Sequence, residues 1–172
     1  AQSRLLGKYW ARIKLAIDRV YTGPRVRQRE TARLVGEAYK ESGLRWPHVE
    51  IMEAFDEFKA EAVVEEALPP LVKSDARIRA MYQDFEKAQG QAERFKSFQL
   101  MFEIVVGRWA AGELPLPGIE PWSEFCDRVQ NGFAALCGNG NRGQRIVIFS
   151  SGGPTGVAMK RALNLSTEAT LK

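Results

Sequence analysis

The residues with the clearest chemical potential lie in a small-residue loop between an apolar run and a predicted helix. Residues 145–149 predict a strand, and Pro154 is typical of a first helical turn. Between them stand Ser150, Ser151 and Gly152. The free N–H groups of the helix would point at this loop, hydroxyls could donate to a ligand, and glycine allows close approach. The pattern predicts an anion-binding site, which we call the anion seat, although it also suits a plain strand-to-helix turn.

A second polar junction follows another predicted strand. Thr22 follows the strand predicted over residues 16–21, and three arginines then open a helix: Arg25, Arg27 and Arg29. The helix macrodipole disfavours positive charge there by ~0.3 to 1 kcal/mol per group. A bound phosphate would offset this cost, whereas side chains that splay into water would feel only a screened penalty. If both strands are parallel in one sheet, the two junctions meet at its carboxyl edge, where open α/β folds bind ligands.

Glu57 and His48 are the remaining candidates for acid–base chemistry. Glu57 follows a short strand predicted over 49–52, so it could reach the same edge and donate a proton. His48 is the only histidine and precedes that strand, which places it at the opposite edge, so we expect no catalytic role for it. Two matches to nucleotide-binding motifs are rejected because their context or sequence is wrong. Residues 138–143 fit G-x-G-x-x-G but precede a strand, and residues 152–160 lack the glycine that a P-loop has before its lysine.

The elements that would position these residues alternate between helix and strand. Apolar residues at helical spacing predict helices over about 5–13, 27–41, 122–136 and 154–163. Together with the short strands, this order predicts an α/β fold with a largely parallel sheet. Three strands are few for such a chain, because a sheet has about five on average.

The middle of the chain has a different character. Residues 55–112 indicate a long helical region, interrupted by Pro69–Pro70 and Gly90, which we interpret as an inserted cap. Residues 112–121 hold three prolines and predict an extended connector. One apolar stripe in this region is predicted to be core, with a substrate lid or a dimer face as alternatives: Phe95, Phe98, Phe102, Val105 and Trp109.

Composition and charge narrow the class of protein. With 45% hydrophobic and 27% charged residues the chain can bury a core, and its net charge is +4. This charge suits an anionic ligand but is too small to indicate nucleic-acid binding. Without a run of about 18 apolar residues or a secretory signal, we expect no membrane association and a cytoplasmic location. Cys126 and Cys137 are predicted to be reduced core thiols.

With these residues in place, the chain resembles the histidine phosphatase superfamily, which has the phosphoglycerate mutase-like fold. The resemblance spans nearly the whole chain and is carried by "VYTGPRVRQRETA" and "VIFSSGGPTGVAMKRALNL", while "AQSRLLGKYW" is similar to the first helix of the family. It implies a single domain over residues 1–172, with three αβα layers, a mostly parallel sheet and a helical cap inserted at about 58–120.

The resemblance also implies a function and a set of site residues. The family transfers a phosphoryl group through a histidine, which implies a phosphatase or mutase that acts on a phosphomonoester without a cofactor. Arg27 would clamp the phosphoryl oxygens and Glu57 would protonate the leaving group. Ser151 stands where the family has its second histidine and would also bind phosphate. The other expected phosphate contacts are Thr22, Ser150 and Gly152.

Two departures from the family pattern affect these expectations. The neutral Ser151 fits either a slow enzyme or a degenerate member that binds a phosphorylated ligand or a partner without turnover. The Arg-His-Gly motif with the nucleophilic histidine has no counterpart, and the family places it just before the helix with which this chain opens. We therefore expect further native polypeptide at the N-terminus and at the C-terminus. The expected ligand is phosphate or a phosphorylated small molecule, and a homodimer is one possibility.

Overall fold

The computed structural model describes residues 1–138 and 143–171 and divides the chain into two compact units. Unit 1 comprises Ala1–Glu57 and Cys126–Leu165, and unit 2 comprises Phe58–Phe125 and Ser166–Lys172. Unit 1 contains the sheet and both polar junctions, whereas unit 2 is helical. Most of the G-x-G-x-x-G match at 138–143 lies outside the described residues.

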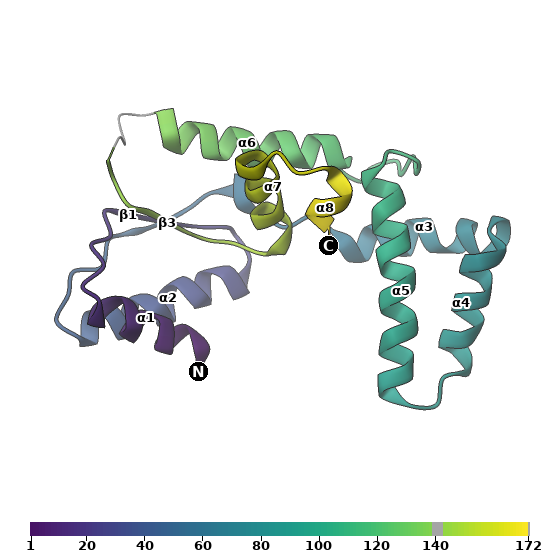
Figure 1. The fold of residues 1–172 in the computed structure, drawn as a ribbon, viewed down its shortest axis with the longest axis horizontal. Coiled ribbons are helices and arrows are strands. Elements are labelled where there is room, and N and C mark those ends of the chain that lie inside the picture. The colour runs from purple at the N-terminus through teal and green to yellow at the C-terminus, as the bar shows by residue number, and fades with distance from the viewer. Residues whose placement is uncertain (139–142, 172) are drawn as a thin grey trace. The chain divides into compact units, whose positions relative to one another are not determined.

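Three parallel strands form the sheet of unit 1, in the order β2-β1-β3. They are β1 (Arg19–Thr22), β2 (Val49–Ile51) and β3 (Ile146–Phe149). Figure 1 labels the neighbouring strands β1 and β3. Thr22 pairs with Ile51 on one side and with Phe149 on the other, so the three strands end at the same level. The prediction of a parallel sheet is confirmed, and the loops that follow its strands share one edge.

The predicted start of the first strand is wrong by three residues. β1 begins at Arg19, because the N–H of Leu15 still bonds back to the carbonyl of Trp10 in α1, at 3.0 Å. The chain joins the sheet only at Asp18, whose N–H donates to the carbonyl of Arg145 at 3.0 Å.

Helices cover both faces of this sheet, which gives unit 1 three αβα layers (Figure 1). One face carries α1 (Gln2–Arg12) and α2 (Val26–Glu41); the other carries α7 (Gly152–Leu163) and the part of α6 (Trp122–Gly138) that belongs to unit 1. Gly7 lets α1 and α2 approach closely, since a Cβ there would lie 2.3 Å from the carbonyl oxygen of Val35. The closeness of these helices therefore depends on the absence of a side chain.

The core beneath α1 and α2 is built from aromatic rings. Trp46 is buried, with its ring centroid 5.4 Å from that of Tyr39 and 6.3 Å from that of Phe149. Trp10 stacks on Trp46 at 6.5 Å. Phe149 is the last residue of β3, so this cluster fixes the strand immediately before the small-residue loop.

Unit 2 contains α3 (Ala60–Ser74), α4 (Ala76–Lys87), α5 (Gln91–Ala110) and α8 (Thr167–Leu171). The predicted interruption at Pro69–Pro70 is wrong, because α3 continues through both prolines to Ser74. Both prolines are exposed, so water can solvate the carbonyls that lose their N–H partners. The helix instead ends at Asp75, whose carboxylate accepts from the N–H groups of Arg77 and Ile78 and starts α4.

The predicted core role of the α5 stripe holds for only half of its length. Val105 and Trp109 are buried, whereas Phe95 is 67% exposed and Phe98 is 41% exposed. Phe102 is half-buried and lies 6.1 Å from Phe98, between ring centroids. The dimer-face and lid alternatives for the exposed half stay predictions.

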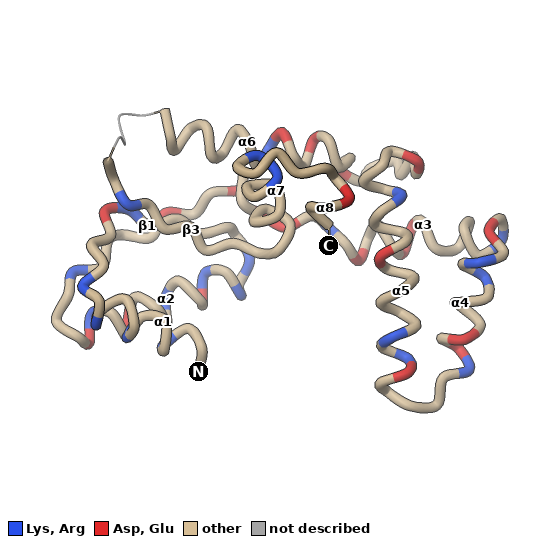
Figure 2. Tube along the Cα trace, in the orientation of Figure 1, with Lys and Arg blue, Asp and Glu red and all other residues tan. Residues whose placement is uncertain are grey.

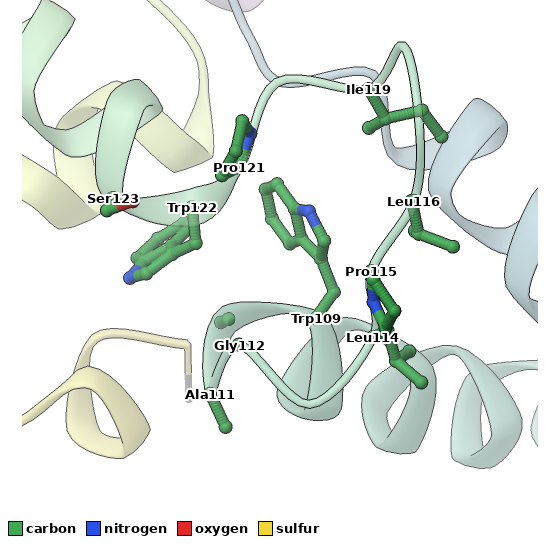
Figure 3. A pocket seen from close by; sticks show the side chains of 11 residues that line it. Trp109, Ala111, Gly112, Leu114, Pro115, Leu116, Ile119, Pro121, Trp122 and Ser123 are labelled. Carbon is green, nitrogen blue, oxygen red and sulfur yellow. The ribbon is translucent and has the colours of Figure 1, made fainter.

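A pocket of about 380 Å³ lies in unit 2, between the end of α5 and the extended connector before α6 (Figure 3). The indole of Trp109 projects between Pro121 on one side and the connector residues Leu116 and Ile119 on the other (Figure 3). None of the lining residues is titratable. The pocket therefore offers apolar packing and no acid–base chemistry.

The two cysteines differ in their surroundings. Both thiols are free, and Cys126 is buried as expected, but Cys137 is exposed, so the prediction that both are core residues is wrong. Burial raises the pKa of the Cys126 thiol. In the part of the chain that the structure describes, no helix is long and apolar enough to cross a membrane.

Candidate functional site

The loops after β1, β2 and β3 meet at the carboxyl edge of the sheet in unit 1. Backbone hydrogen bonds connect them: the N–H of Gly23 donates to the carbonyl of Phe149 at 3.0 Å, and the N–H of Met52 donates to that of Thr22 at 2.8 Å. The first loop leads into α2, the second forms the short 3-10 helix η1 (Glu53–Phe55), and the third leads into α7. Strand register alone therefore brings both predicted junctions together.

Ser151 lies half-buried at this edge, as the N-cap residue of α7. Its Oγ accepts a hydrogen bond from Gln28 Nε2 at 2.9 Å and another from Arg27 Nε at 3.3 Å. Helix α7 begins at Gly152, so Pro154 lies in its first turn as predicted. The structure thus joins Arg27 and Ser151, two expected site residues that are 124 positions apart in the sequence.

Glu57 reaches the N-terminus of the same helix. Its Oε2 accepts a hydrogen bond from the N–H of Gly153 at 3.0 Å. Free N–H groups and the macrodipole favour negative charge at a helix N-terminus, so the carboxylate stands where an external anion would be attracted. A phosphate at this helix end would have to share the Gly153 donor with Glu57 or replace it.

Two of the expected phosphate contacts direct their hydroxyl protons to backbone carbonyls. Ser150 Oγ donates to the carbonyl of Phe55 at 3.0 Å, and the buried Thr22 donates to that of Gly23 at 3.1 Å. These bonds fasten the loops. Gly152, in contrast, is exposed, and nothing lies within 4 Å of the position a Cβ would take, which leaves space beside the start of α7.

Helix α2 carries several basic positions (Figure 2), and the three arginines at its start have different surroundings. Arg25 Nε pairs with Asp56 Oδ1 at 2.6 Å, and its Nη2 donates to the carbonyl of Glu57 at 2.9 Å. Arg29 lines a cavity of about 490 Å³ beside β2, and neither Arg27 nor Ser151 is among the residues that line it. Among the described residues no carboxylate forms an ion pair with Arg27. Arg27 is therefore the arginine that faces the junction with its charge available to an anion.

Sequence reasoning missed Gln28, which is 2% exposed and connects all three loops. Its Oε1 accepts from the N–H of Arg25 at 3.0 Å, while its Nε2 donates to the carbonyl of Phe55 at 3.2 Å and to Ser151. A glutamine three residues after a helix N-cap is one half of the capping-box pattern, so the spacing from Arg25 could have revealed the first contact. The sequence carried no signal for the other two.

The loop after β2 is held by Arg128 of α6, a second residue that the sequence did not indicate. Its Nη1 donates to the carbonyls of Glu53, Ala54 and Asp56 at 3.0, 3.1 and 3.3 Å. Phe55 is fully buried beneath them, with its ring 4.9 Å from that of Phe133. These contacts fix the backbone that presents Glu57.

His48 lies at the opposite edge of the sheet from these groups. It is exposed and directly precedes β2, at the amino end of the strand, as the sequence predicted. Among the described residues, no group of three or more His, Cys, Asp or Glu side chains is arranged to hold a metal ion.

Comparison with known proteins finds similarity of structure but not of sequence families. No protein-family model matches the sequence, and no curated protein matches it. Twelve chains of solved structures match, one of them the crystal structure of an Escherichia coli K-12 protein described as a candidate alpha-ribazole-5'-P phosphatase. The two chains superpose with a TM-score of 0.51 over 97% of this chain and 68% of the other, at 16% sequence identity.

The chain has a phosphoglycerate mutase-like α/β fold. This confirms the fold class predicted from the sequence, a mostly parallel sheet between helical layers with an inserted helical region. An identity of 16% carries the comparison no further than the fold.

Proposed function

We propose that the chain binds the phosphoryl group of a phosphomonoester between the starts of α2 and α7, within a phosphatase or mutase of the histidine phosphatase type. The observation that carries this proposal is the contact between Arg27 and Ser151 beside the N-terminus of α7. A guanidinium, a hydroxyl and free helix N–H groups are the donors that phosphate oxygens prefer. The fold that the chain shares with a candidate phosphatase supports the same conclusion.

Each residue takes a role that its position allows. Arg27 contacts the phosphoryl oxygens and Ser151 donates to one of them. Glu57, held at the N–H of Gly153, is next to the same group; in the complex its carboxylate takes a proton from solvent and gives that proton to the leaving-group oxygen as the P–O bond breaks. Its carboxylate occupies the donor that a phosphate oxygen would take, so Glu57 has to turn from Gly153 toward the leaving group for the phosphate to bind there.

The nucleophile is a residue that this edge of the sheet does not supply. His48 is the only histidine of the sequence and lies at the opposite end of β2. The proposal assigns the phosphoryl-accepting histidine to polypeptide outside the 172 residues. Its nitrogen would take the phosphoryl group, and water or a second hydroxyl would then accept that group.

Titration of the protein with inorganic phosphate and with vanadate tests the binding part of the proposal. We expect saturable binding by calorimetry and a loss of about tenfold in affinity for Arg27→Gln, because charge-assisted hydrogen bonds are the strong ones. Arg29→Gln is the matched control, since Arg29 is on the same helix and lines a cavity that includes neither Arg27 nor Ser151. A wild-type protein that binds neither anion, or equal losses in both variants, would overturn the proposal.

A second candidate function is phosphate binding without turnover. The observation that supports it is the neutral Ser151, which stands where the family that the sequence resembles has a cationic histidine. Hydrolysis of an aryl phosphate by the longer protein that includes the proposed histidine separates the two functions, because both predict no turnover by the 172 residues alone. Turnover that falls in Glu57→Gln supports the phosphatase, whereas anion binding with no turnover supports the binding protein.

A further inference from the structure

We infer that Gln28 is a positioning residue that directs the hydroxyl proton of Ser151 toward the bound phosphoryl group. The inference rests on the proposed function, because it specifies how one donor of that site is oriented. Gln28 itself is buried, with 2% of its surface exposed, and does not need to touch the ligand.

The hydroxyl of Ser151 already accepts two hydrogen bonds. A hydroxyl has one proton to donate and two lone pairs that accept. Both accepting positions of Ser151 Oγ are used, by Gln28 Nε2 at 2.9 Å and by Arg27 Nε at 3.3 Å. Both partners are donors only at these atoms, so the proton of Ser151 must point elsewhere. Among the described residues of unit 1 no hydrogen bond from this hydroxyl is found, and because Ser151 is half-buried its proton reaches solvent, where a phosphoryl oxygen can take the place of water.

The orientation of the Gln28 amide is fixed by its two backbone partners. Its Oε1 faces the N–H of Arg25, which can only donate, and its Nε2 faces the carbonyl of Phe55, which can only accept. A flipped amide would lose both bonds and place two like groups against each other. The amide therefore presents N–H to Ser151, and the buried setting excludes water that could substitute for it.

The tight fit of the first loop holds this arrangement in place. A Cβ on Gly23 would lie 2.2 Å from Gln28 Oε1 and 2.5 Å from the carbonyl oxygen of Phe55. The glycine thus leaves the space that the amide occupies between the loops after β1 and β2. The chemical consequence is a site that selects an oxygen acceptor, such as an unprotonated phosphoryl oxygen, because Ser151 has only a proton to offer it.

A double-mutant cycle on phosphate affinity tests the inference. The variants are Gln28→Met, which keeps the length and removes the N–H donor, Ser151→Ala, and both together. We expect each single variant to bind phosphate about tenfold more weakly, and the double variant to bind no more weakly than Ser151→Ala, because Gln28 acts through the Ser151 hydroxyl. If Gln28 has only a structural role, Gln28→Met weakens binding equally in both backgrounds, and the inference is wrong.

A second pair of variants keeps the inference testable if Gln28→Met does not fold. Ser151→Thr retains a hydroxyl and is expected to bind phosphate within about threefold of wild type, since it keeps the donated hydrogen bond that Ser151→Ala loses. Full phosphate affinity in Ser151→Ala would overturn the inference. A wild-type protein that fails to bind phosphate would instead overturn the proposed function, so the two failures are distinguishable.

Discussion

In the proposed site Glu57 and phosphate would compete for one donor, the N–H of Gly153, which Glu57 occupies in the structure, and this gives a prediction at the scale of single residues. Glu57→Gln removes a negative charge beside the anion seat while keeping the side-chain shape. We expect phosphate to bind a few-fold more tightly to this variant, because like charges within a few ångströms repel. In the longer protein that includes the proposed histidine, turnover of an aryl phosphate should fall at least about a hundredfold, the usual contribution of a general acid.

Calorimetric titration with phosphate measures the first effect, and Glu53→Gln serves as the control because Glu53 is exposed in the same loop. Weaker phosphate binding to Glu57→Gln than to wild type would show that the carboxylate supports the anion seat and does not compete for it.

At the scale of secondary-structure elements, Asp75 joins three helices of unit 2. Its carboxylate caps α4 through two backbone N–H groups and pairs with Arg108 of α5, with Oδ2 2.5 Å from Nη2. The hydrogen bond from Arg108, followed by that from the N–H of Ile78, lowers the pKa of Asp75. Because the folded-state pKa is below the unfolded one, the charged carboxylate stabilises the fold at neutral pH and loses this effect as pH falls through the folded-state value.

Asp75→Asn should isolate this charge, because asparagine can still cap a helix. We expect the variant to unfold at lower urea than wild type at pH 7, and the difference to shrink below about pH 4, near the unfolded-state pKa of aspartate. Asp84→Asn, at an exposed position on α4, is the control. A difference between Asp75→Asn and wild type that is constant with pH would exclude the ion pair as its cause.

The elements also show where sequence reasoning succeeds. The short strands and the loop residues of both junctions could be predicted because β-branched runs, proline and glycine act locally. Parallel register then requires the junctions to meet. The interruption at Pro69–Pro70 was predicted wrongly because the tolerance of an exposed proline pair depends on which face of α3 meets water. The exposure of Phe95 likewise depends on where neighbouring helices end.

The candidate site was less accessible from the sequence than its surroundings. Charge alone could not distinguish Arg25 from Arg27; the difference arises because Asp56, distant in sequence, pairs with Arg25. The contacts of Gln28 with Phe55 and Ser151 are likewise tertiary. Local patterns thus identify the segments that meet at the candidate site, whereas the contacts of individual side chains depend on how the segments pack together.

At the scale of the whole molecule, specific anion binding must be distinguished from attraction to a chain of net charge +4. All residues of the proposed site belong to unit 1, whereas basic residues are present in both units. Hydrogen exchange with phosphate at about a hundred times its Kd separates the two cases, since such binding stabilises the bound state by about 2.7 kcal/mol. We expect slower exchange at residues 23–28 and 151–156 and no change in α4. Charge-driven association would instead slow exchange at basic segments of both units and would disappear in about 1 M sodium chloride, where charges are screened beyond ~3 Å.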